Sequence, residues 1–78
     1  MTYSGVIVIR FFLKELIAEK EFSEDRRITL EEISNETGIH RSTLSKIANV
    51  KGYNTTTDVI DKLCVYFETD VEKIIKHV

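Results

Sequence analysis

The spacing of apolar residues along the chain predicts a series of short helices. In the first series the apolar residues recur every three or four positions with charged residues between them, which is typical of the buried face of an amphipathic helix. This series starts at Ile9 and continues through Phe12, Leu13, Leu16 and Ile17. We expect the first helix to end near Glu21.

A second helix is expected to begin after Thr29. Thr29 and Glu32 have the spacing of a capping box, in which the threonine hydroxyl accepts a hydrogen bond from a backbone N–H three residues later. The face that this helix buries is formed by Leu30, Ile33 and Thr37. Gly38 should end the helix, because glycine adopts the left-handed backbone conformation without steric cost. A tight turn is therefore predicted at Gly38.

The third helix should run from His40 or Arg41 to Asn49. Its inward residues are predicted to be Leu44, Ile47 and Ala48, and its outward residues Arg41, Ser42, Ser45 and Lys46. A loop over residues 49–54 follows.

Two further helices complete the predicted fold. Thr56 or Thr57 should cap the fourth helix, whose apolar stripe is Val59, Ile60, Leu63, Cys64 and Phe67. Asp70 should cap the fifth, whose apolar residues are Val71, Ile74, Ile75 and Val78. With 78 residues and no proline, the chain is expected to be one compact all-α domain of five helices.

The segment Val6–Ile9 departs from the helical pattern. Four consecutive β-branched residues favour an extended strand, and a single strand needs a partner. One interpretation is that it pairs antiparallel with its copy in a second subunit, which gives a two-fold homodimer. The other is that it packs on its own helical core or frays. We accordingly divide the chain into an N-terminal extension, residues 1–9, and a helix-turn-helix domain, residues 10–78.

The two central helices and the turn between them carry the most informative pattern. The stretch over residues 30–47 reads LEEISNETGIHRSTLSKI, with small Ser34 where crossing helices approach and Gly38 at the turn. It continues as ANVKGYNTTTDVIDKLC. Over about residues 10–76 the chain resembles the Cro and lambda-repressor-like (Xre-type) helix-turn-helix family. The family usually has glutamine where this chain has Leu30, so one expected phosphate contact lacks its usual side chain, and alanine where this chain has Ser34.

The resemblance implies a sequence-specific DNA-binding transcriptional regulator of the repressor type, whose third helix reads the major groove. Carried onto this chain, the family's base-reading positions are Arg41, Ser42, Ser45 and Lys46. The sugar-phosphate contacts are His40, Thr43, Lys51, Tyr53 and Asn54. The expected partners are double-stranded DNA and a second copy of the chain, with no small-molecule cofactor.

Charge placement supports the same interpretation. The formal net charge is −2, which is unfavourable for a nonspecific polyanion binder, but no acidic residue lies between Gly38 and Thr57, a window that holds Arg41, Lys46 and Lys51. Such a cationic face suits contact with phosphates. The simpler interpretation is an ordinary solvated surface.

Other classes of function find less support. Cys64 lies within an apolar stripe, which favours a structural thiol over a nucleophile, and no metal-ligand spacing appears; we expect neither an enzyme nor a metal site. One cysteine forms no internal disulfide, and no apolar run is long enough for a membrane span, which together favour the cytoplasm. The main alternative is a protein-interaction module, such as an antitoxin or a phage regulatory partner.

Overall fold

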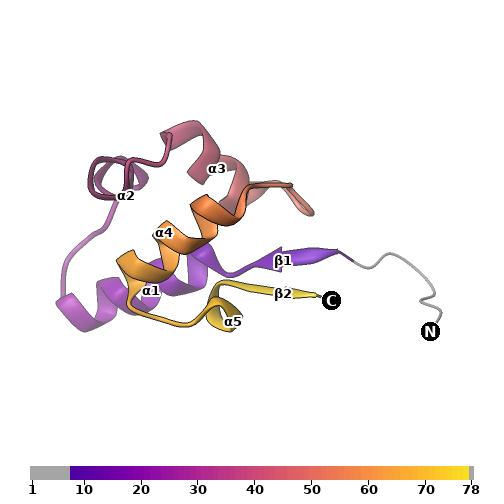
Figure 1. Ribbon diagram of the computed structural model, residues 1–78. Helices are drawn as coiled ribbons and strands as arrows, with labels where there is room; N and C mark the ends of the chain where they lie inside the picture. The colour runs from indigo at the N-terminus through magenta and orange to yellow at the C-terminus, as the bar shows by residue number, and fades with distance from the viewer. Residues whose placement is uncertain (1–7, 78) are drawn as a thin grey trace.

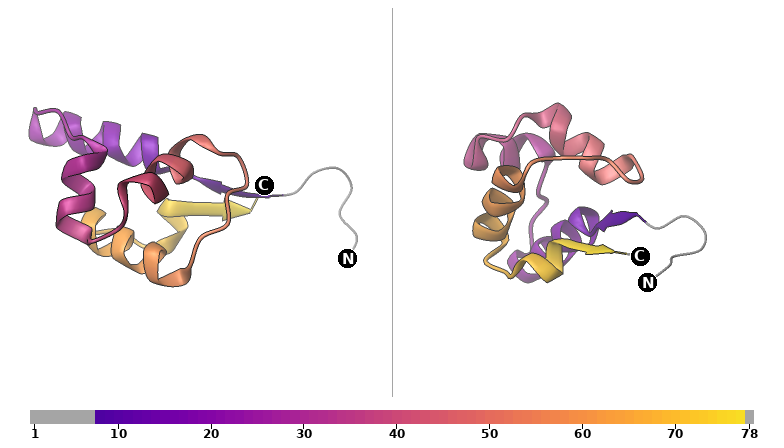
Figure 2. Two further views of the ribbon diagram at one scale, coloured as in Figure 1. Left: turned by 90° about the horizontal axis from the view of Figure 1, so that it is seen from above. Right: turned by 45° about the vertical axis from the view of Figure 1, so that its right-hand side comes forward.

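The computed structural model describes residues 8–77, which form five helices and a two-stranded sheet (Figure 1). In chain order the elements are β1 (Ile9–Phe11), α1 (Leu13–Glu24), α2 (Leu30–Thr37), α3 (Arg41–Asn49), α4 (Thr57–Phe67), α5 (Val71–Ile74) and β2 (Ile75–His77). The predicted five-helix architecture is confirmed. In Figures 1 and 2, α2 and α3 lie on one side of the molecule, and α5 and the sheet lie on the opposite side.

Every helix contributes at least one side chain to a single apolar core. The buried residues of the helices are Leu13, Ile33, Leu44, Ile47, Leu63 and Ile74. The segments before and after α2 add Ile28 and Ile39. Burial of one such side chain stabilises the fold by roughly 1.5 to 3 kcal/mol. The core therefore ties α3 to elements from both ends of the chain.

The two ends of the chain form the sheet. β1 and β2 are antiparallel, with Ile9 opposite His77, Arg10 opposite Lys76 and Phe11 opposite Ile75. The Phe12 N–H donates to the Ile74 carbonyl at 2.8 Å, which continues this pairing.

This pairing corrects two sequence-based expectations. The first helix was expected from Ile9 but begins at Leu13, because residues 9–11 are paired with β2. The fifth helix ends at Ile74, so Ile75 belongs to a strand. Of the expected strand over residues 6–9, Val6 and Ile7 lie outside the described residues, and Ile9 pairs with His77 of its own chain. β1 spans the expected boundary between residues 9 and 10.

Most of the observed helix ends are those that the sequence predicted. The hydroxyls of Thr29 and Thr56 accept hydrogen bonds from the N–H groups of Glu32 and Val59, which confirms both as N-caps. Asp70 stands at the start of α5, but its side chain makes no capping hydrogen bond. α1 runs to Glu24, three residues further than expected, because Asp25 takes the left-handed conformation (φ 52°) that closes it.

No helix within residues 8–77 is both long enough and apolar enough to cross a lipid bilayer.

Candidate nucleic-acid interface

The turn between α2 and α3 is held by several short hydrogen bonds. Gly38 has a φ of 80°, and its N–H donates to the Ser34 carbonyl at 2.9 Å. The Ser34 hydroxyl donates to the Ile39 carbonyl at 2.6 Å. The Thr37 hydroxyl accepts from the Ile39 N–H at 3.1 Å and donates to the Ile33 carbonyl at 2.7 Å. Because the polar groups of the turn are bonded within it, the direction in which α3 leaves is fixed.

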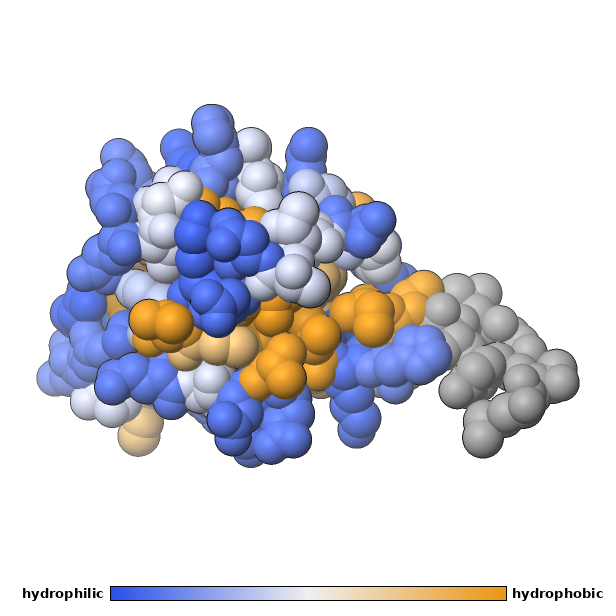
Figure 3. All heavy atoms as spheres, in the orientation of Figure 1, coloured by the Kyte–Doolittle hydropathy of each residue, from blue (hydrophilic) through white to orange (hydrophobic). Residues whose placement is uncertain are grey.

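One face of α3 is anchored in the core and the opposite face is open to solvent. Leu44 and Ile47 are buried, and Ala48 packs against the same cluster. Arg41, Ser42 and Lys46 are exposed, and Ser45 is half-buried. Figure 3 shows that the surface at the top of this view, where α2 and α3 lie, is mostly polar. The four residues expected to read bases thus lie on α3 with their side chains wholly or partly accessible.

The residues expected to contact the DNA backbone lie just before α3, within it at Thr43, and in the loop that follows it. His40, Lys51 and Asn54 are exposed, whereas Thr43 is half-buried. Tyr53 is half-buried and packs against the core. His40 and Ser42 lie close together, with Nδ1 and Oγ 3.4 Å apart. The structure therefore presents His40, Lys51 and Asn54 most openly, and Tyr53 only in part.

Asn49 belongs to the same accessible face, although it is not among the residues expected from the sequence to contact DNA. It is exposed, its Nδ2 donates to the Ser45 carbonyl at 2.9 Å, and the same atom lies 3.5 Å from Ser45 Oγ. Residues four apart on a helix share a face, so its spacing from Ser45 was the available signal. Side-chain amides are suited to hydrogen bonding with adenine.

No carboxylate among the described residues neutralises the cations of this region. Among the residues that the structure describes, Arg41, Lys46 and Lys51 form no ion pair. Several cations elsewhere are paired with carboxylates: Arg10, Lys20, Arg26 and Lys62. The face around α3 thus combines free positive charge with hydroxyl and amide groups, which is the chemistry that phosphates and base edges require.

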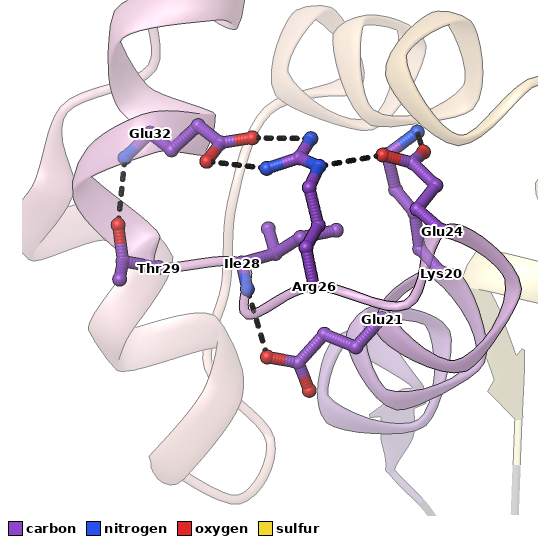
Figure 4. A network of polar contacts seen from close by, with 7 residues as sticks. All are labelled: Lys20, Glu21, Glu24, Arg26, Ile28, Thr29 and Glu32. Carbon is purple, nitrogen blue, oxygen red and sulfur yellow. Dashed lines mark hydrogen bonds and ion pairs between the residues drawn. The ribbon is translucent and has the colours of Figure 1, made fainter.

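A network of ion pairs links α1 to α2 through Arg26, which lies in the loop between the two helices (Figure 4). The Arg26 guanidinium lies 2.9 Å from a Glu24 carboxylate oxygen and 2.8 Å from a Glu32 carboxylate oxygen. Lys20 Nζ lies 2.7 Å from the Glu24 carboxylate. The hydrogen bond from Arg26 lowers the pKa of the Glu32 carboxyl. The pKa of the Glu24 carboxyl is lowered most by the hydrogen bond from Lys20 and next by that from Arg26. The Glu32 carboxylate is thus paired with Arg26. The Glu32 backbone N–H donates to the Thr29 hydroxyl, which is the hydrogen bond that the threonine of a capping box accepts.

The chain segment before α2 is fixed as well. The Glu21 carboxylate accepts a hydrogen bond from the Ile28 N–H at 2.8 Å, and Ile28 is buried (Figure 4). The start of α2 is therefore held to α1 by a carboxylate-to-backbone bond and by ion pairs. These contacts are solvent-exposed to differing degrees, so we assign them a positioning role and only modest stabilisation.

The surroundings of Cys64 do not favour a nucleophilic thiol, and the described residues form no cluster of metal ligands. Cys64 is half-buried against the core, and burial raises the pKa of its thiol, which disfavours the nucleophilic thiolate. Within residues 8–77, no three histidine, cysteine, aspartate or glutamate side chains cluster so as to hold a metal ion.

Comparison with known proteins agrees with this geometry. Residues 13–78 match the sequence model of a family described as "Cro/C1-type HTH DNA-binding domain". No curated protein matches the chain. The crystal structure of the transcriptional regulator VanUg, form II, is similar to the whole chain over 95% of its own length, with a TM-score of 0.66 and 18% sequence identity. At this identity, the similarity shows a shared fold.

Proposed function

The chain belongs to the Cro/C1-type helix-turn-helix DNA-binding domain family, and on this basis we propose that it is a sequence-specific transcriptional regulator, and more narrowly a repressor. The observation that carries the proposal is the accessible face of α3, where Arg41 and Lys46 are exposed and form no ion pair with a described residue, while Leu44 and Ile47 are buried on the opposite side. A rigid helix with this division fits the major groove. The proposed role is binding without enzymatic chemistry.

The proposed contacts divide into two groups. Arg41, Ser42, Ser45 and Lys46 read base edges, and Asn49 extends this set by one position. His40, Thr43, Lys51, Tyr53 and Asn54 contact the sugar-phosphate backbone and set the register. Arginine grips guanine through two hydrogen bonds, which gives roughly 1 to 3 kcal/mol of discrimination against other bases. In this proposal residues 10–78 are the DNA-binding domain, and residues 1–9 are an extension.

The proposed regulator acts in the cytoplasm as a homodimer. Two copies related by a two-fold axis would present their α3 helices to half-sites about 34 Å apart, or one turn of DNA. Occupation of such a site by two copies blocks access to it, which is the simplest way for a single small domain to repress.

Selection of bound sequences from a random duplex pool tests this function. The expected result is enrichment of a roughly palindromic site, and a fluorescence anisotropy titration with that site should show an affinity that falls steeply as salt rises. Absence of enrichment, together with absence of binding to mixed duplex at low salt, would reject DNA binding.

One observation favours a protein partner as a second candidate function. Phe22 on α1 is 90% exposed and Val65 on α4 is 71% exposed, and exposed large apolar side chains are common at protein contacts. An interaction module of the antitoxin or phage-regulator kind would use such residues. In the titration above, no binding at low salt is the result that this alternative predicts.

A further inference from the structure

An apolar groove runs between β1 and the end of α3. Its volume is about 430 Å³. One wall is formed by residues 8–11, and the other by residues 47–52, which end α3 and begin the following loop. Ile9 and Val50 are 39% and 48% exposed. In Figure 3 an apolar band crosses this face below α3 and reaches the place where the described chain begins.

One wall of the groove is a strand that keeps an unpaired edge among the described residues. Within residues 8–77, β1 pairs with β2 and with no other strand. The groove is lined by residues of β1 and by none of β2, and β1 has one edge with which no described strand pairs. Unpaired N–H and C=O groups beside an apolar trough are the two features that allow an extended segment to bind by strand addition.

The sequence immediately before Val8 suits this groove. Residues 1–7 read MTYSGVI, with two apolar β-branched residues at Val6 and Ile7 and no charged side chain. To reach the edge of its own β1, this segment would have to reverse direction within the run Val6–Ile9. Four consecutive β-branched residues favour an extended chain and not a turn. The same segment of a second copy reaches the groove without any reversal.

We propose that the groove between β1 and the end of α3 binds residues 6–8 of a second copy of this chain, laid antiparallel along the free edge of β1. By two-fold symmetry the contact is reciprocal, and it joins two sheets in the order β2, β1, β1, β2. This inference rests on the proposed homodimer, and it names the surface that forms it.

The solution mass tests the inference. Sedimentation equilibrium of the full chain should give the mass of two chains. V6D/I7D, which changes the inserted segment, and V50D, which changes the groove wall, should each raise the dimer dissociation constant about a hundredfold, because each buries unpaired charge at two symmetric contacts. The matched control T2D/S4D, with the same added charge outside residues 6–8, should leave it unchanged. A monomer at all concentrations, or a dimer that persists in V6D/I7D, would overturn the proposal.

A cross-link identifies the occupant. In a C64A background, an oxidised mixture of I7C and V50C should form a mixed disulfide between chains. Absence of that product, or a disulfide within one chain as the main product of I7C/V50C, would overturn the proposal in favour of an empty groove or of the chain's own segment.

DNA binding is measured separately, so that the two proposals fail independently. Salt-sensitive binding of V6D/I7D to a duplex with one half-site should match that of wild type, since the segment is not part of the face around α3. Weaker half-site binding by V6D/I7D than by T2D/S4D would contradict the assignment of residues 6–8 to the subunit contact alone.

Discussion

At the scale of single residues, α3 separates two tasks between its faces. Leu44 and Ile47 are buried and hold the helix, and Arg41 and Lys46 are exposed and form no ion pair within residues 8–77. A substitution on the open face is therefore expected to remove a proposed contact with DNA and to leave the core intact. This separation allows binding and folding to be tested independently.

Arg41→Ala should weaken binding to the selected site by roughly 1 to 3 kcal/mol, because it removes a paired contact to a base edge. Binding to random duplex should weaken much less. Fluorescence anisotropy with both duplexes measures the difference, and urea unfolding should show unchanged stability. Equal losses on the two duplexes would refute the assignment of Arg41 as a base reader.

Lys51→Ala should weaken binding to the selected site and to random duplex alike, because a phosphate contact does not depend on sequence. The slope of log affinity against log salt should flatten by about one unit. Lys73→Ala is the matched control, since Lys73 is also exposed but lies on α5, opposite α3 in Figure 1. Equal effects of the two substitutions would show that the contact is not local to the loop after α3.

Some residues were predictable from the sequence and others were not. The outward position of Arg41 and Lys46 follows from the apolar positions Leu44 and Ile47, because helical spacing alone determines it. Ser34 was expected only to be small, whereas its hydroxyl bonds the Ile39 carbonyl. That bond exists only once the turn at Gly38 has formed, so no local sequence pattern predicts it.

At the scale of elements, the turn between α2 and α3 depends on its glycine. A Cβ placed on Gly38 would meet no atom within 4 Å, so the cost of a side chain there is the cost of a φ of 80°. Gly38→Ala should therefore destabilise the fold by roughly 1 kcal/mol in urea unfolding. Gly38→Asn should cost less, because asparagine tolerates this conformation. Equal losses would indicate that packing, and not backbone conformation, makes the position sensitive.

The ion pairs between α1 and α2 should give the stability a dependence on acid. Arg26 lowers the pKa of Glu32 in the folded protein below its usual 4.5, so the pair stabilises the fold above that pH. The contribution is lost as pH falls through the lowered pKa. The stability difference between wild type and Arg26→Ala should thus be largest near neutral pH and shrink below pH 4.5.

Urea unfolding at a series of pH values measures this difference. Arg27→Ala is the matched control, since Arg27 is exposed and forms no ion pair with a described residue. Its difference from wild type should not vary with pH. A difference for Arg26→Ala that stays constant down to pH 3 would contradict the role assigned to the pair.

The sequence predicted the elements whose signals are local. Thr29, Thr56 and Gly38 were identified as helix boundaries because capping acts within four residues. The sheet was not predicted, because Phe11 and Ile75 come from opposite ends of the chain and their pairing is set by the folded core. The same long-range pairing explains why Ile9 is a strand residue and not the start of a helix.

At the scale of the whole molecule, charge is distributed unevenly on a rigid framework. The net charge is −2, yet the segment from Gly38 to Thr57 holds no acidic residue. Approach to DNA should therefore favour the side of the molecule that presents α3, because acidic surfaces elsewhere are repelled by phosphate. In the proposed complex with DNA, the fold sets the orientation of α3, and the side chains of α3 and the loop after it make the contacts.

The most direct test of this account is a map of the backbone amide signals of ¹⁵N-labelled protein that shift when duplex DNA is added at low salt. We predict that the largest shifts fall between residues 38 and 54 and reverse when salt is raised. Shifts confined to α1 and α5, or no shifts at any duplex concentration, would contradict the claim that α3 and the loop after it form the DNA-binding surface.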